Sequence, residues 1–343
     1  MQPLGGGRLR RGSRKLFNAS LAALALVAIM SSGTALAAPG SPAQVTHRPA
    51  AGPCGQAERP HQYKHVIEIW MENHSYDSII GSPDAPYANQ LAAQCGLATN
   101  YHNITHPSAP EYLAATSGEL GGANDCTPSQ CPDNNPSIFG QLDAAGKSWK
   151  TYAEGMSTNC DQGPLDSGYA PPYDVNHNPA VYYPALLNSC LRNDVPMGTI
   201  TSGNFAHALA TGLPAFSFIA PDLNHDTHNA PVPVGDQYLS QLIPAITASH
   251  DYRDGSTAIL LVWDEGEGGT ATDCAYNTTD IGCHVAALVI SPSTRPGTTS
   301  DVLFNHYSLL KTAEQLLHLP YLGHANDAQV ISMSKAFGLT GHR

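Results

Sequence analysis

Four short apolar runs most strongly constrain the fold of this chain. They span residues 65–71, 215–221, 257–264 and 284–291. Each run is too short, and too rich in β-branched or aromatic residues, for an ordinary helix, so we expect four buried strands. Amphipathic helical stretches occupy residues 110–118, 236–249 and 307–319. Buried strands interspersed with helices predict an α/β fold with a mostly parallel central sheet.

The N-terminus has the pattern of a secretory signal peptide. Basic residues precede the apolar stretch LAALALVAIM, and Ala35-Leu36-Ala37 offers a small-residue cleavage site. We therefore expect residues 1–37 to be cleaved and the protein to be secreted. No later segment is long and apolar enough to span a membrane. Residues 38–60, rich in Pro, Ala and Gly, are expected to form a flexible leader, and residues 61–343 a single domain.

Charge argues against nucleic acid as a partner. Five of the 16 Lys and Arg residues precede the expected cleavage site, so the mature chain has 11 basic residues against 28 acidic ones, a net charge near -17. Such a chain repels phosphate backbones and anionic membranes. Acidic residues gathered at one site can still hold a cation, and an acidic protein can then act on an anionic substrate.

All eight cysteines follow the expected signal peptide. They are Cys54, Cys95, Cys126, Cys131, Cys160, Cys190, Cys274 and Cys283. An even number of cysteines in an exported chain indicates disulfides, and the absence of a CxxC pair disfavours the alternative of a zinc site. We expect Cys126 to pair with Cys131 and Cys274 with Cys283, and the sequence leaves the other pairings open.

Three of the expected strands end on polar clusters. The first is followed by Glu72-Asn73, the second by the segment 222–228 (DLNHDTH), and the third by Asp264-Glu265. Ligands of α/β proteins bind at the carboxyl ends of parallel strands. Carboxylate and amide oxygens suit a divalent cation, which is our preferred reading of these pairs. For Asp264-Glu265 the alternative is a solvated turn, because a glycine-rich segment follows.

Two further groups of polar residues are candidates for chemistry. In the segment 222–228, two aspartates and two histidines are candidate metal ligands or a general acid. Ser108, with Pro110 and Glu111 after it, is typical of a helix start, in which Ser108 is the N-cap and Glu111 completes a capping box. The same position suits a nucleophile, because a helix N-terminus attracts phosphate and a metal activates a hydroxyl.

Five segments in a fixed order resemble the bacterial phosphoesterase family. They are ENHSYDSIIG, HPSAPEYLAATSG, FIAPDLNHDTHN, LLVWDEGEG and NHYSLLKTAEQLLHLP, and they cover most of residues 65–323. The family contains secreted acid phosphatases and phospholipases C within the alkaline-phosphatase-like superfamily. The resemblance implies a three-layer α/β/α sandwich. In size the chain is similar to short actinobacterial secreted acid phosphatases, some of which act on phosphatidylinositol 3-phosphate.

The resemblance also implies roles for individual residues. Ser108 matches the nucleophile that forms a phosphoseryl intermediate, and His228, with Asp226, matches the general acid for the leaving group. His106 matches a residue that contacts the phosphate. The implied metal ligands are Glu72, Asn73, Asp264 and Glu265. Candidates for a second metal or for phosphate contacts are Asp222, Asp226, His284 and His177.

The chain departs from the family pattern at two positions. Glu111 stands where relatives commonly have an asparagine near the phosphoryl oxygens, and Asn176 stands where relatives often have a lysine. A carboxylate at position 111 would repel a phosphate unless it turns away from it or binds a cation. The arginine of the sulfatase signature is absent after Ser108, which argues against sulfate esters as substrates.

The sequence therefore predicts a secreted, metal-dependent phosphomonoesterase. Oxygen ligation suits Ca²⁺ or Mg²⁺, and histidine participation would suit Zn²⁺. The expected substrate is a phosphate monoester, and phosphoinositides are one candidate. A phospholipase C that cleaves phosphodiesters is the first alternative. A calcium-stabilised secreted binding protein, in which Ser108 only caps a helix, is the second.

Overall fold

The computed structural model describes residues 52–122, 124–165 and 172–340. The expected signal peptide and most of the expected leader lie outside these residues. The main sheet has eight strands in the order β5-β4-β6-β1-β7-β8-β2-β9. They are β1 His65–Met71, β2 Gly96–Ala98, β4 Trp149–Ala153, β5 Asp194–Pro196, β6 Phe216–Ala220, β7 Thr257–Trp263, β8 Ala287–Ile290 and β9 Thr298–Ser300. A two-stranded sheet pairs β3 (Tyr101–His102) with β10 (Phe304–Asn305).

Strand pairing confirms the mostly parallel sheet. Strand β1 is parallel to both β6 and β7, and β4 is parallel to β5 and β6. Strand β8 is the exception, since it is antiparallel to both β7 and β2. All four predicted strands form, although the fourth is shorter than its apolar run and occupies only Ala287–Ile290.

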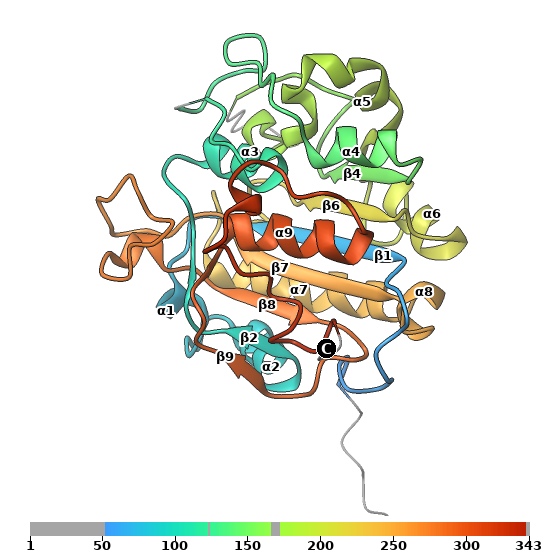
Figure 1. Ribbon diagram of the computed structural model, residues 1–343, viewed down its shortest axis with the longest axis vertical. Coiled ribbons are helices and arrows are strands. Elements are labelled where there is room, and N and C mark those ends of the chain that lie inside the picture. The colour runs from blue at the N-terminus through green and yellow to red at the C-terminus, as the bar shows by residue number, and fades with distance from the viewer. Residues whose placement is uncertain (1–51, 123, 166–171, 341–343) are drawn as a thin grey trace, which may run out of the picture. The chain divides into compact units, whose positions relative to one another are not determined.

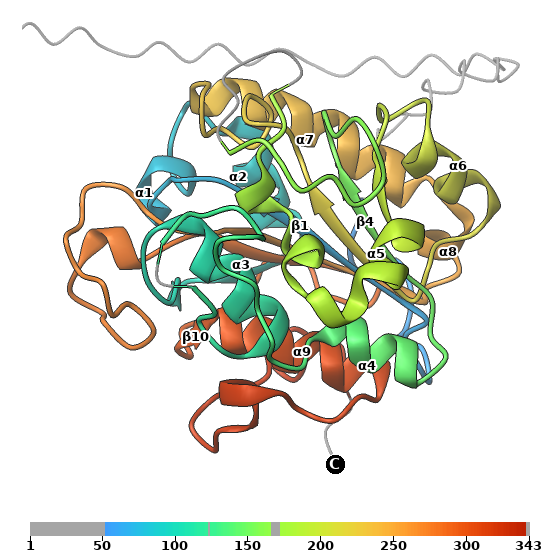
Figure 2. The same ribbon diagram turned by 90° about the horizontal axis from the view of Figure 1, so that it is seen from above.

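Helices cover both faces of the sheet and complete the predicted three layers (Figures 1 and 2). Helices α3, α4 and α9 lie on one face, and α2, α7 and α8 lie on the other. The α-helices are α1 Tyr76–Ile79, α2 Pro86–Gln94, α3 Ser108–Ser117, α4 Ile138–Ala144, α5 Leu187–Asn193, α6 Asn204–Thr211, α7 Val232–Thr247, α8 His250–Arg253 and α9 His306–Leu317. Short 3-10 helices are η1 Val175–His177, η2 Pro179–Tyr182, η3 Pro184–Leu186, η4 Ile281–Cys283 and η5 Gly323–Asn326. No helix among the described residues is long and apolar enough to cross a membrane.

The core lies at the centre of the sheet, which explains why its strands are mostly apolar in sequence. Every residue of β7 is buried, as are six of the seven residues of β1. Trp70 of β1 packs against Tyr112 of α3 and Phe218 of β6, with ring centroids 4.9 and 5.6 Å apart. Burying each such large apolar side chain contributes about 1.5–3 kcal/mol, so the central strands are held firmly.

The start of α3 differs from the predicted capping box. The N-cap residue is Pro107, and Ser108 is the first residue of the helix rather than its cap. The Glu111 carboxylate accepts hydrogen bonds from the backbone N–H groups of Ile104 and Thr105 in the preceding loop. The prediction was wrong because loop and helix fold back on each other, and Glu111 therefore finds its donors upstream of Ser108.

Four disulfides pair all eight cysteines. Both predicted pairs, Cys126–Cys131 and Cys274–Cys283, are confirmed. The other two are Cys54–Cys95 and Cys160–Cys190. Residues 52–60, which we expected in a loosely attached leader, are tied to the end of α2 through Cys54. This bond anchors the segment to the helix that precedes β2.

Candidate active site

The carboxyl ends of β1 and β7 bring the two predicted acidic pairs together. Met71 and Trp263, the last residues of these strands, are direct partners in the parallel register, so the residues that follow them are neighbours. The Asp264 N–H donates to the Met71 carbonyl at 2.9 Å, and the Asn73 N–H donates to Asp264 Oδ1 at 3.0 Å. The strand ends thus place Glu72-Asn73 beside Asp264-Glu265, in the crevice expected for this sheet type.

Ser108 points into this acidic cluster. Its Oγ lies 3.2 Å from Glu72 Oε2 and 3.3 Å from Glu265 Oε1, and the residue is buried. One hydroxyl proton serves only one of these carboxylates at a time. The start of α3 therefore delivers a serine oxygen to a point where two carboxylates converge, and either carboxylate can take its proton.

His177 bridges Glu72 to Asp226. Its Nε2 lies 3.2 Å from Glu72 Oε1, and its Nδ1 lies 3.2 Å from Asp226 Oδ2. Burial disfavours charge on the ring, but the hydrogen bond and charge of Asp226 outweigh burial and raise the pKa of His177 to about 9. The two carboxylates beside it therefore favour the cationic form of His177. Asn176 stands where relatives often have a lysine, but the neighbouring His177 still gives the site a positive charge.

Carboxylate crowding makes the site a good host for a cation. Burial raises the pKa of Glu72 well above its ordinary value, and the nearby Asp264 and Asp226 raise it further. Asp264 Oδ2 is buried and has no hydrogen-bond partner among the described residues. Over the same residues, the ion-pair partners of Glu72, Glu265 and Asp226 are histidines, never lysine or arginine. An orphaned buried oxygen between like charges fits a divalent cation.

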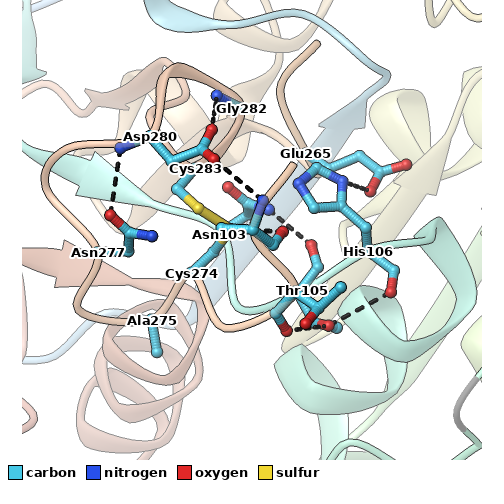
Figure 3. The surroundings of a disulfide bond; sticks show 12 residues. Asn103, Thr105, His106, Glu265, Cys274, Ala275, Asn277, Asp280, Gly282 and Cys283 are labelled. Atoms are coloured by element: carbon cyan, nitrogen blue, oxygen red, sulfur yellow. Dashed lines mark hydrogen bonds and ion pairs between the residues drawn. A yellow bond between two sulfur atoms is a disulfide. The ribbon is translucent and has the colours of Figure 1, made fainter. Parts of the chain in front are cut away.

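His106, two residues before Ser108, pairs with Glu265. Its Nδ1 contacts Glu265 Oε2, and this hydrogen bond raises the pKa of His106. Figure 3 shows this pair next to the loop closed by Cys274–Cys283. The loop braces the His106 segment, because the Cys274 N–H donates to the Ile104 carbonyl at 2.8 Å and the Thr105 hydroxyl donates to the Thr272 carbonyl at 2.8 Å.

His228 enters the site from the segment after β6. Its donor atom and those of Glu72 and His177 all lie within 4.8 Å of one another, which makes this trio a second possible metal-ligand group. The His228 ring is exposed, and Asp226 Oδ1 accepts the backbone N–H of His228 at 2.7 Å. The imidazole that Asp226 orients is that of His177, whereas the sequence pattern suggested His228.

Two predicted site residues lie outside this arrangement. Asp222 belongs to a separate group with Glu154 and His225, in which His225 Nδ1 lies 2.9 Å from Glu154 Oε2. The His284 ring stacks on Tyr76 with centroids 4.3 Å apart, and its Nε2 lies 3.2 Å from the Thr99 carbonyl. The contacts given for Asp222 and His284 thus lie outside the cluster around Ser108.

Sequence reasoning missed Tyr112 and Asp125. The Tyr112 hydroxyl donates to Glu72 Oε1, and Asp125 Oδ1 accepts the Ala109 N–H at 3.0 Å near the start of α3. Helical spacing was an available signal for Tyr112, because residues i and i+4 share a helix face and Ser108 lies one turn away. Asp125 sits in a loop remote from any motif, so no sequence signal pointed to it.

Comparison with known proteins gives consistent matches. The Phosphoesterase family matches residues 82–320. A phosphatidylinositol-3-phosphatase of Mycobacterium tuberculosis is 28% identical over 79% of this chain and 82% of its own length. A probable acid phosphatase of Kluyveromyces lactis is 29% identical over 79% of this chain, and the match covers 62% of that relative. A non-hemolytic phospholipase C of Burkholderia pseudomallei is 26% identical over 67% of this chain and 40% of its own length.

Comparison with solved structures supports the three-layer α/β/α fold described above. A crystal structure of a protein in the alkaline phosphatase superfamily from Vibrio parahaemolyticus aligns with a TM-score of 0.51 at 12% identity. The alignment covers 80% of this chain and 72% of that protein. At such low identity the likeness shows the fold alone. The family match covers more than half of the chain and its relatives carry phosphatase names, so this protein belongs to the Phosphoesterase family and is a phosphoric ester hydrolase.

Proposed function

We propose that this protein is a secreted, metal-dependent phosphomonoesterase that works through a phosphoserine at Ser108. The position of Ser108 Oγ, 3.2 and 3.3 Å from two buried carboxylates at a helix start, is the observation that carries the proposal. The predicted signal peptide and four disulfides support export. The mycobacterial relative, named for its action on phosphatidylinositol 3-phosphate, makes phosphoinositides a candidate substrate class.

The proposed cation ligands are Glu72, Asn73, Asp264 and Glu265. This oxygen-rich set fits Ca²⁺ or Mg²⁺. Zn²⁺ would instead use the Glu72, His177 and His228 group, and His177 would then have to lose its proton. A bound divalent cation would lower the pKa of the serine hydroxyl and offset the negative charge of the phosphate.

The chain's own residues can then carry the proton transfers. Glu72 or Glu265 takes the Ser108 proton as the Oγ–P bond forms and the bond from phosphorus to the ester oxygen breaks. His228 donates a proton to the departing alcohol, and His106, whose Nε2 has no hydrogen-bond partner among the described residues, donates to a phosphoryl oxygen. Cationic His177, held between Glu72 and Asp226, offsets part of the negative charge. Water then attacks phosphorus and gives a proton to His228, the Oγ–P bond breaks, and the carboxylate that took the Ser108 proton returns it to Oγ as phosphate leaves.

The test is phosphate release from p-nitrophenyl phosphate. We expect Ser108→Ala to lower kcat by at least about a thousandfold, as for other nucleophile deletions, and a chelator to abolish wild-type activity until a cation is restored. Ser117→Ala is the matched control, because Ser117 is a buried serine of the same helix whose hydroxyl donates to the Leu113 carbonyl. Wild-type rates in Ser108→Ala would refute the mechanism.

The same assay separates the alternatives. Hydrolysis of bis(p-nitrophenyl) phosphate without hydrolysis of the monoester would favour the phospholipase C type of activity. No hydrolysis of either ester under any cation would favour the binding protein.

A further inference from the structure

Glu111 and His306 are two buried titratable residues with no part in the reaction proposed above. Both are fully buried, and His306 Nε2 lies 3.4 Å from Glu111 Oε2. Burying a carboxylate is costly unless donors surround it. Here the donors come from one short segment, since Glu111 accepts the backbone N–H groups of Ile104 and Thr105, and the Asn103 side-chain amide at 3.3 Å. The segment that Glu111 holds leads directly to His106 and Ser108.

His306 connects the same carboxylate to the other half of the site. Its Nε2 lies 2.6 Å from the Asp264 backbone carbonyl, which can only accept, so Nε2 carries the hydrogen. Its Nδ1 lies 2.8 Å from the Tyr101 hydroxyl. The ring also packs on Trp70 with centroids 4.9 Å apart. His306 therefore contacts β1, the end of β7, β3 and α3 at once.

We propose that Glu111 and His306 form a buried positioning pair that fixes residues 104–108 against the Asp264 end of β7. The pair thereby sets the separation between the Ser108 oxygen and the carboxylates that receive it. The proposal rests on the function proposed above for Ser108. It also explains the departure at position 111, since Glu111 is turned toward the loop before α3 and is committed to donors there.

Glu111→Gln is the sharpest perturbation. The amide keeps Oε1 as acceptor for the Ile104 and Thr105 N–H groups. Its NH₂ group takes the place of Oε2, which accepts the Ile104 N–H at 2.9 Å and lies 3.4 Å from His306 Nε2, so donors oppose each other there. A displacement of about 1 Å in a reacting group costs about a hundredfold in rate. We expect kcat for p-nitrophenyl phosphate to fall about 10- to 100-fold with KM changed less than about threefold.

Glu314→Gln is the matched control. Glu314 is a buried glutamate of α9, the helix that begins at His306, and its Oε1 accepts the Leu322 N–H at 2.9 Å. It should keep wild-type kcat and KM, and both variants should keep the native far-ultraviolet circular dichroism spectrum, which shows that the fold is intact. Wild-type kcat in Glu111→Gln, or a parallel loss in the control, would overturn the proposal.

Coupling between the two residues is measured with His306→Gln and the double variant. If they act as one unit, Glu111→Gln/His306→Gln loses no more kcat than the worse single variant. Losses in the double variant that equal the product of the two single losses would refute the pair.

Hydrogen exchange at the Ile104 and Thr105 amides gives a readout independent of activity. Should the wild type release no phosphate, the proposed function would be wrong. Faster exchange in His306→Gln would still support the pair, and unchanged exchange would refute it.

Discussion

Removal of the Cys54–Cys95 disulfide should destabilise the protein more than removal of any other of its four disulfides. This bond joins the first described segment to the end of α2 across 41 residues of chain. A cross-link stabilises mainly by restricting the unfolded chain, and the restriction grows with the logarithm of the loop length. Cys126–Cys131 spans only 5 residues and provides the natural comparison.

The loop lengths set the expected magnitudes. Chain entropy assigns about 4 kcal/mol to the 41-residue loop and about 2 kcal/mol to the 5-residue loop at 25 °C. Cys160–Cys190 and Cys274–Cys283, with separations of 30 and 9 residues, fall between them. Burial widens the gap, because Cys54 and Cys95 are fully buried and their replacement by alanine also leaves a small cavity.

The assay is urea unfolding of Cys54→Ala/Cys95→Ala beside Cys126→Ala/Cys131→Ala, both followed by far-ultraviolet circular dichroism. We expect the first variant to lose roughly 2 kcal/mol more than the second in the free energy of unfolding. Equal losses, or a larger loss for the short loop, would show that chain entropy does not govern these bonds. Identical native spectra are the control for an intact fold.

Two further predictions concern buried carboxylates. Burial raises the pKa of Glu314 to about 8 from its ordinary 4.5, so the folded state binds the extra proton and stability should fall as pH rises through this window, by up to about 1.4 kcal/mol per pH unit. Glu314→Gln should flatten the stability profile between pH 5 and 8 in urea titrations, and an unchanged slope would contradict this cause. Asp236 of α7 accepts the N–H groups of Tyr87 and Ala88 at 2.9 and 2.8 Å, which caps α2 from outside. Asp236→Ala should cost about 2–3 kcal/mol in urea unfolding, and a loss under about 0.5 kcal/mol would refute the capping role.

Periodicity and length were enough to predict the four central strands, the helices α3, α7 and α9, and the mostly parallel sheet, whereas the short strands and helices gave no clear sequence signal. Strands buried on both faces are mostly apolar, so β1 and β7 are visible in the sequence as apolar runs that end at Met71 and Trp263. The exception is Glu68 of β1, which is buried and accepts the Trp70 Nε1–H at 3.2 Å. The same logic predicted that Glu72 and Asp264 would lie at strand ends. Local pairing also identified the two disulfides with short loops, because neighbouring cysteines in a loop have few other partners.

Tertiary structure alone decided how the side chains meet. Ser108 and Glu111 read as a capping box, yet the fold turns one toward Glu72 and the other toward Ile104. The link from Asp226 to His177 joins segments 49 residues apart, and no periodic pattern encodes such a contact. Sequence patterns report which face of an element is buried. The atom-to-atom contacts of polar groups depend on loop paths and on the position of each element, which only the packed molecule determines.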